Sequence, residues 1–413
     1  MYKAILVGAD FQNNNSIDYY MEELKNLAEA SDIEVVYSMT QAINKITSNF
    51  YIGSGKVQEI KTFATNLDAD LVIFNNELSG TQIRNLEEQL DTRVIDRTLL
   101  ILDIFASRAK TKEAMLQVEI AQLEYMLPRL NGLSESLGRQ QGGIGSKGPG
   151  EKKLEVDRRK IESERSRLKK ELSDIVKARK VQRKNRLKSN IRKVAVVGYT
   201  NAGKSTLLNK LIEFTTQELD KKVYVENMLF ATLETSTRNI TLSNNKEFTA
   251  TDTVGFVSNL PHNLIESFKS TLEEITEADL LIHLFDGSND FYEEQIKVTN
   301  KTLEEIGVHD IPVIYIYNKS DLFVKDIVPR HHPNLIVSMK NGYDIKLILN
   351  MIEEELFKDY EILSLLIPFS EGELVSFFNE NTNIIKQEYT NDGTIITLEL
   401  SPILRGKYKK YIK

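Results

Sequence analysis

The sequence predicts an α/β protein built from four regions. Its 413 residues exceed one ordinary core, because domains usually hold roughly 100 to 200 residues. Two stretches alternate strand-like apolar runs with helical patterns, which is typical of parallel sheets covered by helices. We expect a parallel-sheet α/β domain at 1–107, a long antiparallel helical hairpin at 108–190, a doubly wound α/β domain with a phosphate-binding loop at 191–358, and a small α+β domain at 359–413.

The first region holds four strand-like runs, at Lys3–Gly8, Ile33–Met39, Asp70–Asn75 and Arg93–Asp96. Between the second and the third run, Gly53-Ser54-Gly55-Lys56 opens a helix whose backbone N–H groups could receive an anion. The motif lacks the spacing of a full phosphate loop. A plain strand-to-helix turn is therefore favoured over a second nucleotide site.

Two apolar stripes at helical spacing predict the hairpin. The stripe of the first helix consists of Leu116, Ile120, Leu123, Leu127 and Leu130, and that of the second of Leu154, Ile161, Leu168, Leu172 and Ile175. The irregular stretch between them, residues 131–150, holds seven of the chain's 20 glycines together with Arg139, Gln140, Gln141 and Lys147. Glycine lets a partner's backbone come close. A loop that contacts nucleic acid is therefore favoured over a passive linker.

The charge distribution points to the same region. Residues 147–193 contain 19 Lys/Arg and 7 Asp/Glu, a charge of +12, whereas the whole chain carries −7. The remainder is therefore at −19, and such a contrast indicates a polyanionic partner. The absence of cysteine excludes disulfides and thiolate chemistry and favours a cytoplasmic location. No apolar run approaches the roughly 20 residues that span a bilayer, and no secretory signal is expected.

A phosphate-binding loop follows the strand-like run Val194–Val197. It reads Gly198-Tyr199-Thr200-Asn201-Ala202-Gly203-Lys204-Ser205 and leads into a helix at 206–213, the context that this motif requires. Lys204 is expected to reach the β- and γ-phosphates, and the Ser205 hydroxyl to bind Mg²⁺. After the next apolar strand, at 247–251, comes Asp252-Thr253-Val254-Gly255, in which Asp252 can hold Mg²⁺ through water and the Gly255 N–H can face the γ-phosphate.

The base is predicted by Asn318-Lys319-Ser320-Asp321, which follows the apolar strand at 312–317. The Asp321 carboxylate can accept hydrogen bonds from N1–H and the exocyclic amine of guanine, whereas adenine presents the opposite pattern. Ser338-Met339-Lys340 stands where a short loop would contact guanine O6. A further segment, Phe230-Ala231-Thr232-Leu233-Glu234 with Thr235–Arg238, must order around the γ-phosphate, and spacing alone does not decide which threonine binds Mg²⁺. GTP is thus favoured over ATP.

The last region has no recognisable chemistry. Runs at 362–368, 384–389 and 394–400 predict a strand and a hairpin, with a short helix between.

Taken together, these motifs resemble the HflX family of ribosome-associated GTPases over essentially the whole chain. The likeness lies in residues 198–205, 230–233, 252–256 and the glycine-rich stretch from Leu130 to Gly150. It implies that Thr232 binds Mg²⁺ and acts with Lys204 and Gly255 in catalysis. It also implies binding to the 50S subunit and splitting of 70S or dimerised idle ribosomes, or their rescue, under stress. From the basic hairpin we expect contacts with 23S rRNA through Arg139, Lys147, Lys152 and Lys153, and we expect a monomer. Glu234-Thr235 departs from the family's Asp-Pro at these positions.

Hydrolysis is expected to be slow without a partner. Phe256 follows Gly255, where many GTPases place a glutamine that orients the attacking water. Asn201 stands at a loop position that in related GTPases coordinates K⁺, which can replace an arginine finger; Arg238 is expected to be a solvated charge. Two alternatives stay open: a GTP-dependent RNA-binding switch in large-subunit assembly, and an ATP-using RNA remodeller that acts through residues 53–56.

Overall fold

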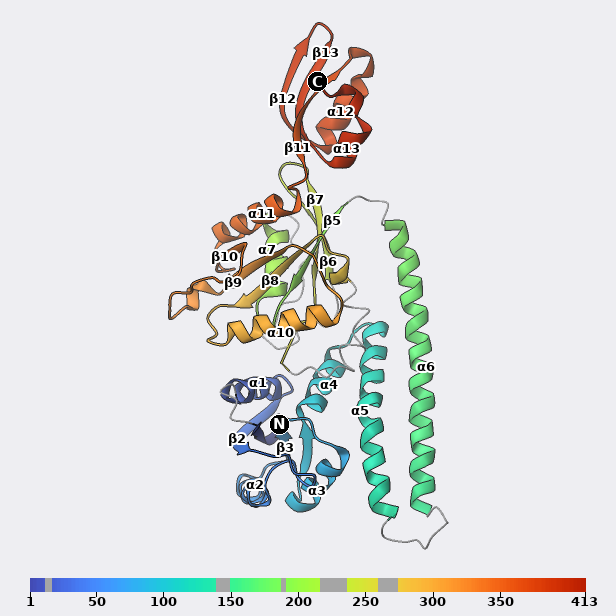
Figure 1. The fold of residues 1–413 in the computed structure, drawn as a ribbon, viewed down its shortest axis with the longest axis vertical. Coiled ribbons are helices and arrows are strands. Elements are labelled where there is room, and N and C mark those ends of the chain that lie inside the picture. The colour runs from blue at the N-terminus through green and yellow to red at the C-terminus, as the bar shows by residue number, and fades with distance from the viewer. Residues whose placement is uncertain (12–16, 139–148, 187–190, 216–235, 259–273) are drawn as a thin grey trace. The chain divides into compact units, whose positions relative to one another are not determined.

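The computed structural model describes residues 1–11, 17–138, 149–186, 191–215, 236–258 and 274–413 (Figure 1). By internal contacts they form two units. The first comprises residues 1–188 and the described residues 254–258, and the second comprises the rest. Within these ranges the fold is α/β with several domains, as predicted.

The N-terminal sheet is parallel, with strand order β2-β1-β3-β4. Helices α2 and α3 pack on one face, where Val57, Ile60 and Leu86 meet Val72 and Phe74, and helices α1 and α4 cover the other (Figure 1). Side chains of both faces are buried, which explains the nearly continuous apolar strands. The bounds are β1 Tyr2–Phe11, α1 Ile17–Glu29, β2 Ile33–Ile43, α2 Ser54–Leu67, β3 Leu71–Phe74, α3 Gly80–Leu90, β4 Arg93–Asp96 and α4 Arg97–Arg108.

Helices α5 (Lys112–Gly138) and α6 (Pro149–Arg186) form the predicted antiparallel hairpin (Figure 1). Their apolar seam contains Leu116, Ile120 and Leu123 of α5 against Leu168, Leu172 and Ile175 of α6. The expectation that residues 131–150 are irregular throughout was wrong at both ends. Helix α5 continues to Gly138 because its two glycines in this stretch cost only about 1 kcal/mol each, and α6 begins at Pro149, a residue favoured in the first helical turn.

The second unit contains a six-stranded sheet with strand order β10-β9-β8-β5-β7-β6, parallel except for β6. Helices α7 and α11 pack on one face through Leu207, Leu211 and Ile348, and α10 covers the other through Ile296. Its strands are β5 Arg192–Val197, β6 Ser236–Thr241, β7 Glu247–Asp252, β8 Leu280–Asp286, β9 Val313–Asn318 and β10 Asn334–Ile336; its helices are α7 Lys204–Thr215, α10 Tyr292–Glu305 and α11 Gly342–Leu356. Strand β6, which includes Arg238, was not predicted.

The C-terminal residues form an antiparallel sheet of order β11-β13-β12 with helices on one face. Lys246, in the turn between β6 and β7, joins this sheet to α11. Its ammonium lies 2.9 Å from Glu353 Oε1 and 2.7 Å from Glu399 Oε1, and the residue is only 8% exposed. The elements are β11 Glu361–Ile367, α12 Gly372–Asn381, β12 Asn383–Thr390, β13 Gly393–Leu400 and α13 Pro402–Lys407.

One histidine of the second unit is buried. His283 lies within β8, is 1% exposed, and packs against Phe285 and Tyr315. Neither ring nitrogen has a hydrogen-bond partner among the described residues. Burial, with smaller contributions from His331 and Lys204, lowers the pKa of His283 to about 3. The folded protein therefore holds this imidazole neutral.

We expect the free energy of unfolding to fall as the pH drops below about 6.5. The unfolded chain binds a proton on this histidine near pH 6.5, whereas the folded chain does so only near pH 3. The contribution of His283 to the free energy of unfolding is therefore complete above pH 6.5. It is lost as the pH falls towards 3, by at most about 1.4 kcal/mol per pH unit. In urea unfolding, His283→Phe should reduce this slope and His309→Phe, at an exposed site, should keep it. Equal slopes in both variants would contradict the assignment.

Candidate nucleotide-binding site

The loop after β5 turns around two glycines. Gly198 has a φ of +146°, and a Cβ there would lie 1.9 Å from the Leu284 carbonyl oxygen. Gly203 has a φ of +102°, and its Cβ would lie 2.6 Å from Asn318 Nδ2. Only glycine fits both positions. Because α7 begins directly afterwards, at Lys204, the loop ends at the positive end of a helix, the arrangement that binds phosphate.

Lys204 is 7% exposed and is held inside this loop. Its ammonium donates to the carbonyl oxygens of Gly198 (3.1 Å) and Tyr199 (2.8 Å). Burial lowers the pKa of Lys204 to about 8, against the opposing charge of Asp252. A phosphate in the loop would replace these carbonyl contacts with full negative charges. The other loop residues are buried Thr200 and Ala202 and exposed Asn201, which has a φ of +60°.

Two of the residues predicted to hold magnesium, Ser205 and Asp252, lie together and come from two elements. Ser205 Oγ, in the first turn of α7, donates to Asp252 Oδ2 at 2.6 Å, at the carboxyl end of β7. Asp252 and Thr253 are fully buried, and Thr253 Oγ1 donates to the Val196 carbonyl at 2.7 Å. A hydroxyl and a carboxylate are the oxygen donors that Mg²⁺ prefers, so these residues fit the ion. The predicted residues Phe230, Ala231, Thr232, Leu233 and Glu234 lie outside the described residues.

The predicted guanine-reading residues also meet. Asn318 Nδ2 donates to the Ala202 carbonyl at 2.9 Å, which ties the end of β9 to the phosphate loop. Asp321 Oδ1 accepts from Ser338 Oγ at 2.7 Å and Oδ2 from Lys340 Nζ at 2.5 Å. These two donors, Lys340 first, lower the pKa of Asp321, which keeps its carboxylate ionised. Between the two motifs, Met339 N donates to Asn318 Oδ1 at 3.4 Å.

Two carboxylates that support this loop were not predicted. Asp286 Oδ2, at the end of β8, accepts from Lys319 Nζ at 2.6 Å, and Lys319 has a φ of +63°. Asp344 Oδ2 accepts from Ser338 N at 2.8 Å. Asp286 had a signal in the sequence, since it ends a buried strand as Asp252 does. Asp344 had none, because it lies in an ordinary helix start.

Residues 254–258, which follow Thr253, belong to the first unit. Phe256 is 3% exposed, so its ring is buried as an apolar side chain rather than presented to water. The Ser258 carbonyl accepts from Arg97 Nη2 at 3.1 Å, and Ser258 N donates to Glu23 Oε1 at 3.4 Å. Arg97 and Glu23 form a buried ion pair with each other. The chain just beyond Gly255 is thus tied to the N-terminal sheet domain.

Two possible anion donors at the turn at Gly53 already have partners. Gly53 N donates to Gln41 Oε1 at 3.0 Å, and Lys56 Nζ pairs with Glu59 Oε2 at 2.9 Å. Helix α2 begins there as predicted. The Gly53 N–H and the Lys56 ammonium are thus engaged within the domain, which favours a plain strand-to-helix turn.

Three family models match successive parts of the chain. Residues 18–106 match a GTP-binding GTPase N-terminal domain, 108–186 a GTP-binding GTPase middle region, and 193–319 a 50S ribosome-binding GTPase domain. GTPase HflX of Caldanaerobacter subterraneus subsp. tengcongensis is 45% identical over 95% of this chain and 90% of its own length. The chain belongs to the HflX family of GTPases. GTPase HflX of Escherichia coli is 37% identical over 97% of this chain and 94% of its own.

Among solved structures, the complex of SsGBP with GDP covers 87% of this chain and 99% of its own, at 24% identity and a TM-score of 0.47. Membership in the HflX family confirms the predicted resemblance, the guanine nucleotide and the GTPase activity. None of the described helices is long and apolar enough to cross a membrane.

Proposed function

We propose that this HflX GTPase binds Mg²⁺-GTP in the site above and uses it to bind and split ribosomes. Lys204 and the N–H groups of 198–205 hold the phosphates, Ser205 and Thr232 bind Mg²⁺ directly, and Asp252 does so through water. Asn318–Asp321 and Ser338–Lys340 select guanine. The observation that best supports this site is the hydrogen bond of 2.9 Å from Asn318 Nδ2 to the Ala202 carbonyl oxygen. It holds the base-reading motif against the phosphate-binding loop.

The partner follows from charge and from the family. The domain model that matches 193–319 describes a 50S ribosome-binding GTPase, and residues 147–193 carry +12 in an otherwise acidic chain. We propose that 23S rRNA is contacted by Arg139 and Lys147, which lie outside the described residues, and by Lys152 and Lys153 of α6, whose side chains also lie outside them. Phosphate contacts of this kind weaken steeply with salt. The protein acts as a monomer in the cytoplasm.

Sedimentation of intact ribosomes with the protein tests the proposal. With GTP or a non-hydrolysable analogue, subunits should appear in the gradient at low salt and decrease as salt rises. Splitting with both nucleotides means that binding separates the subunits and hydrolysis resets the protein. Binding to large subunits without any splitting would favour an assembly switch. Retention of ATP binding in Lys204→Ala, together with its loss in Lys56→Ala, would favour the ATP-using remodeller.

Potassium is the proposed substitute for an arginine finger. Asn201 is exposed in the phosphate loop with a φ of +60°, so its side chain is available to a cation beside the phosphates. We expect faster GTP turnover in K⁺ than in Na⁺ at equal ionic strength, by about tenfold or more, because a correctly sized cation stabilises the charge that develops in the transition state. Asn201→Ala should remove the difference. Equal rates of GTP turnover by the parent protein in K⁺ and Na⁺ would contradict the proposed role of potassium.

A further inference from the structure

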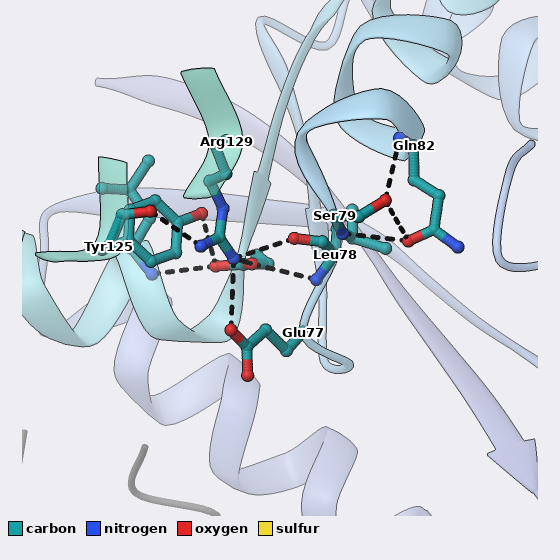
Figure 2. A network of polar contacts seen from close by, with 8 residues as sticks. Glu77, Leu78, Ser79, Gln82, Tyr125 and Arg129 are labelled. Atoms are coloured by element: carbon teal, nitrogen blue, oxygen red, sulfur yellow. Dashed lines mark hydrogen bonds and ion pairs between the residues drawn. The ribbon is translucent and has the colours of Figure 1, made fainter. Parts of the chain in front are cut away.

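The distal part of α5 is fastened to the N-terminal sheet domain by polar contacts. On α5, the apolar cluster described between α5 and α6 contains Leu116, Ile120 and Leu123. Beyond Leu123, Tyr125 and Arg129 lie four residues apart on one face of α5 and meet the ends of β3 and β4 (Figure 2). The distal part of α5 thus has a polar contact with the N-terminal sheet domain in addition to the apolar seam with α6.

Asp96 is the centre of the polar contact. It is 0% exposed, and its carboxylate accepts four hydrogen bonds: from Leu99 N and Tyr125 Oη on Oδ1, and from Leu78 N and Arg129 Nη2 on Oδ2, all between 2.9 and 3.0 Å. Four donors fill the acceptor capacity of a carboxylate. Two of them come from backbone N–H groups of the sheet domain and two from side chains of α5. The Asp96 carboxylate therefore binds both the N-terminal sheet domain and α5.

Helix α5 presents its two donors as a preassembled pair. The Arg129 guanidinium lies 3.4 Å from the centre of the Tyr125 ring, and its Nη1 donates to the Tyr125 carbonyl at 2.9 Å. Nη2 also donates to the Leu78 carbonyl at 2.8 Å (Figure 2). Burial and the Asp96 charge raise the pKa of Tyr125, so its hydroxyl remains a donor. The planar guanidinium is fixed in direction, as a flexible ammonium would not be.

The backbones also touch at this point. A Cβ on Gly80, the first residue of α3, would lie 2.5 Å from the Arg129 carbonyl oxygen and 2.8 Å from its Cα. Only glycine permits so close an approach. Pro128 removes one backbone donor from α5 in the same turn, which weakens the helix locally. The contacts with Asp96 offset that weakness where the sheet domain holds the helix.

We propose that Asp96 is a positioning residue that makes the N-terminal sheet domain and the distal half of α5 one rigid body. This rigid body fixes the direction in which the α5–α6 hairpin, called the arm below, meets its partner. The identity of the partner rests on the proposed function; the rigid body does not. From Leu123 to the end of α5 at Gly138 is 15 residues, or about 22 Å. A loosening of about 10° at that pivot would move the helix end by about 4 Å, more than a hydrogen bond tolerates.

Distance measurement between two spin labels tests the rigid body. The chain has no cysteine, so Asn66→Cys on α2 and Met126→Cys on α5, both exposed, give a single labelled pair. The parent should give one narrow distance distribution. Tyr125→Phe combined with Arg129→Gln removes both donors of α5, and Gly80→Ala forces the backbones apart; each should broaden or shift the distribution. Because the second variant leaves Asp96 and its partners chemically intact, a folding defect in one does not decide the result.

Two matched controls should leave the distance distribution unchanged. Lys25→Gln changes an exposed lysine of α1, and Gly372→Ala changes the first residue of α12, where a Cβ meets nothing within 4 Å. A role in overall stability alone would lower the melting temperature without widening the distances. An unchanged, narrow distribution in both test variants therefore overturns the proposal.

Affinity for isolated large subunits tests the aiming role. It should fall by about tenfold in both test variants, because an arm that must be ordered on binding binds more weakly than a preorganised one. Turnover of GTP without ribosomes should stay within about twofold, since no changed residue touches the nucleotide site. Broadened distances with unchanged affinity would overturn the aiming role. If the parent itself did not bind large subunits, the proposed function would fail while the distances still decided the rigid body.

Discussion

Asp321→Asn should reduce the affinity for GTP by roughly 10³-fold or more and create affinity for xanthosine triphosphate. Guanine presents two donors, N1–H and the exocyclic amine, to the carboxylate. An asparagine offers one acceptor and one donor, and its donor opposes the guanine amine. Xanthine has a carbonyl at that place and restores the match. Equilibrium binding of both nucleotides to both proteins measures the exchange.

The gain of affinity for xanthosine triphosphate is the decisive part of this result. Asp321 also holds Ser338 and Lys340, so its loss could weaken GTP merely by loosening their loop. A loosened loop would not prefer xanthine. Asp326→Asn, at an exposed position five residues further on, should leave both affinities unchanged. If Asp321→Asn lost GTP without gaining xanthosine triphosphate, direct reading of the base by this carboxylate would be wrong.

Lys204→Met should weaken GTP binding by roughly 10²-fold and abolish measurable hydrolysis. The ammonium is already inside the phosphate loop, held by the Gly198 and Tyr199 carbonyls, so phosphate meets a preplaced charge. Methionine keeps the chain length without that charge. Lys210→Met, in the same helix but paired with Glu213 at the surface, is the matched control. Hydrolysis at the parent rate in Lys204→Met would contradict the assignment.

The same residue predicts a pH dependence with a definite sign. Because burial lowers the pKa of Lys204 to about 8, half of the free protein is deprotonated there near pH 8. Phosphate binds the protonated form and raises the pKa, so binding takes up a proton above that value. GTP affinity should therefore decline as the pH rises beyond 8, by at most about tenfold per unit. Lys204→Met should not share this decline.

The sequence was most informative where a function depends on neighbouring residues. The phosphate loop, the Asp252 segment and Asn318–Asp321 were predicted because strand, turn and helix signals stand next to one another in the chain. Contacts between distant residues had no such signal. Arg97 and Ser258 are 161 positions apart, and Asp96 and Arg129 are 33 apart. Nothing in a single sequence relates such pairs, because their proximity is produced only by the packed fold.

Local patterns also failed where context outweighed them. Gly132 and Gly138 suggested an irregular loop, yet α5 passes Gly132 and ends only at Gly138, because one glycine costs little in a long helix. Ser236–Arg238 lacked an apolar run and were assigned only to a nucleotide-ordering segment. They begin β6, an edge strand that needs a buried side chain on only one face.

The fastening at Lys246 has a consequence for experiments on shortened proteins. Lys246 stands at the closed end of the β6–β7 hairpin, and Asp252 at the far end of β7. A chain ended at residue 358 would lose Glu399 and leave the ammonium with Glu353 alone. We therefore expect such a protein to be an altered background for measuring GTP turnover, because the lost ion pair loosens one end of a hairpin whose other end carries Asp252. Glu399→Gln in the full-length protein removes the ion pair with Lys246 but keeps the C-terminal sheet, so it separates the effect of the ion pair from the effect of losing the sheet.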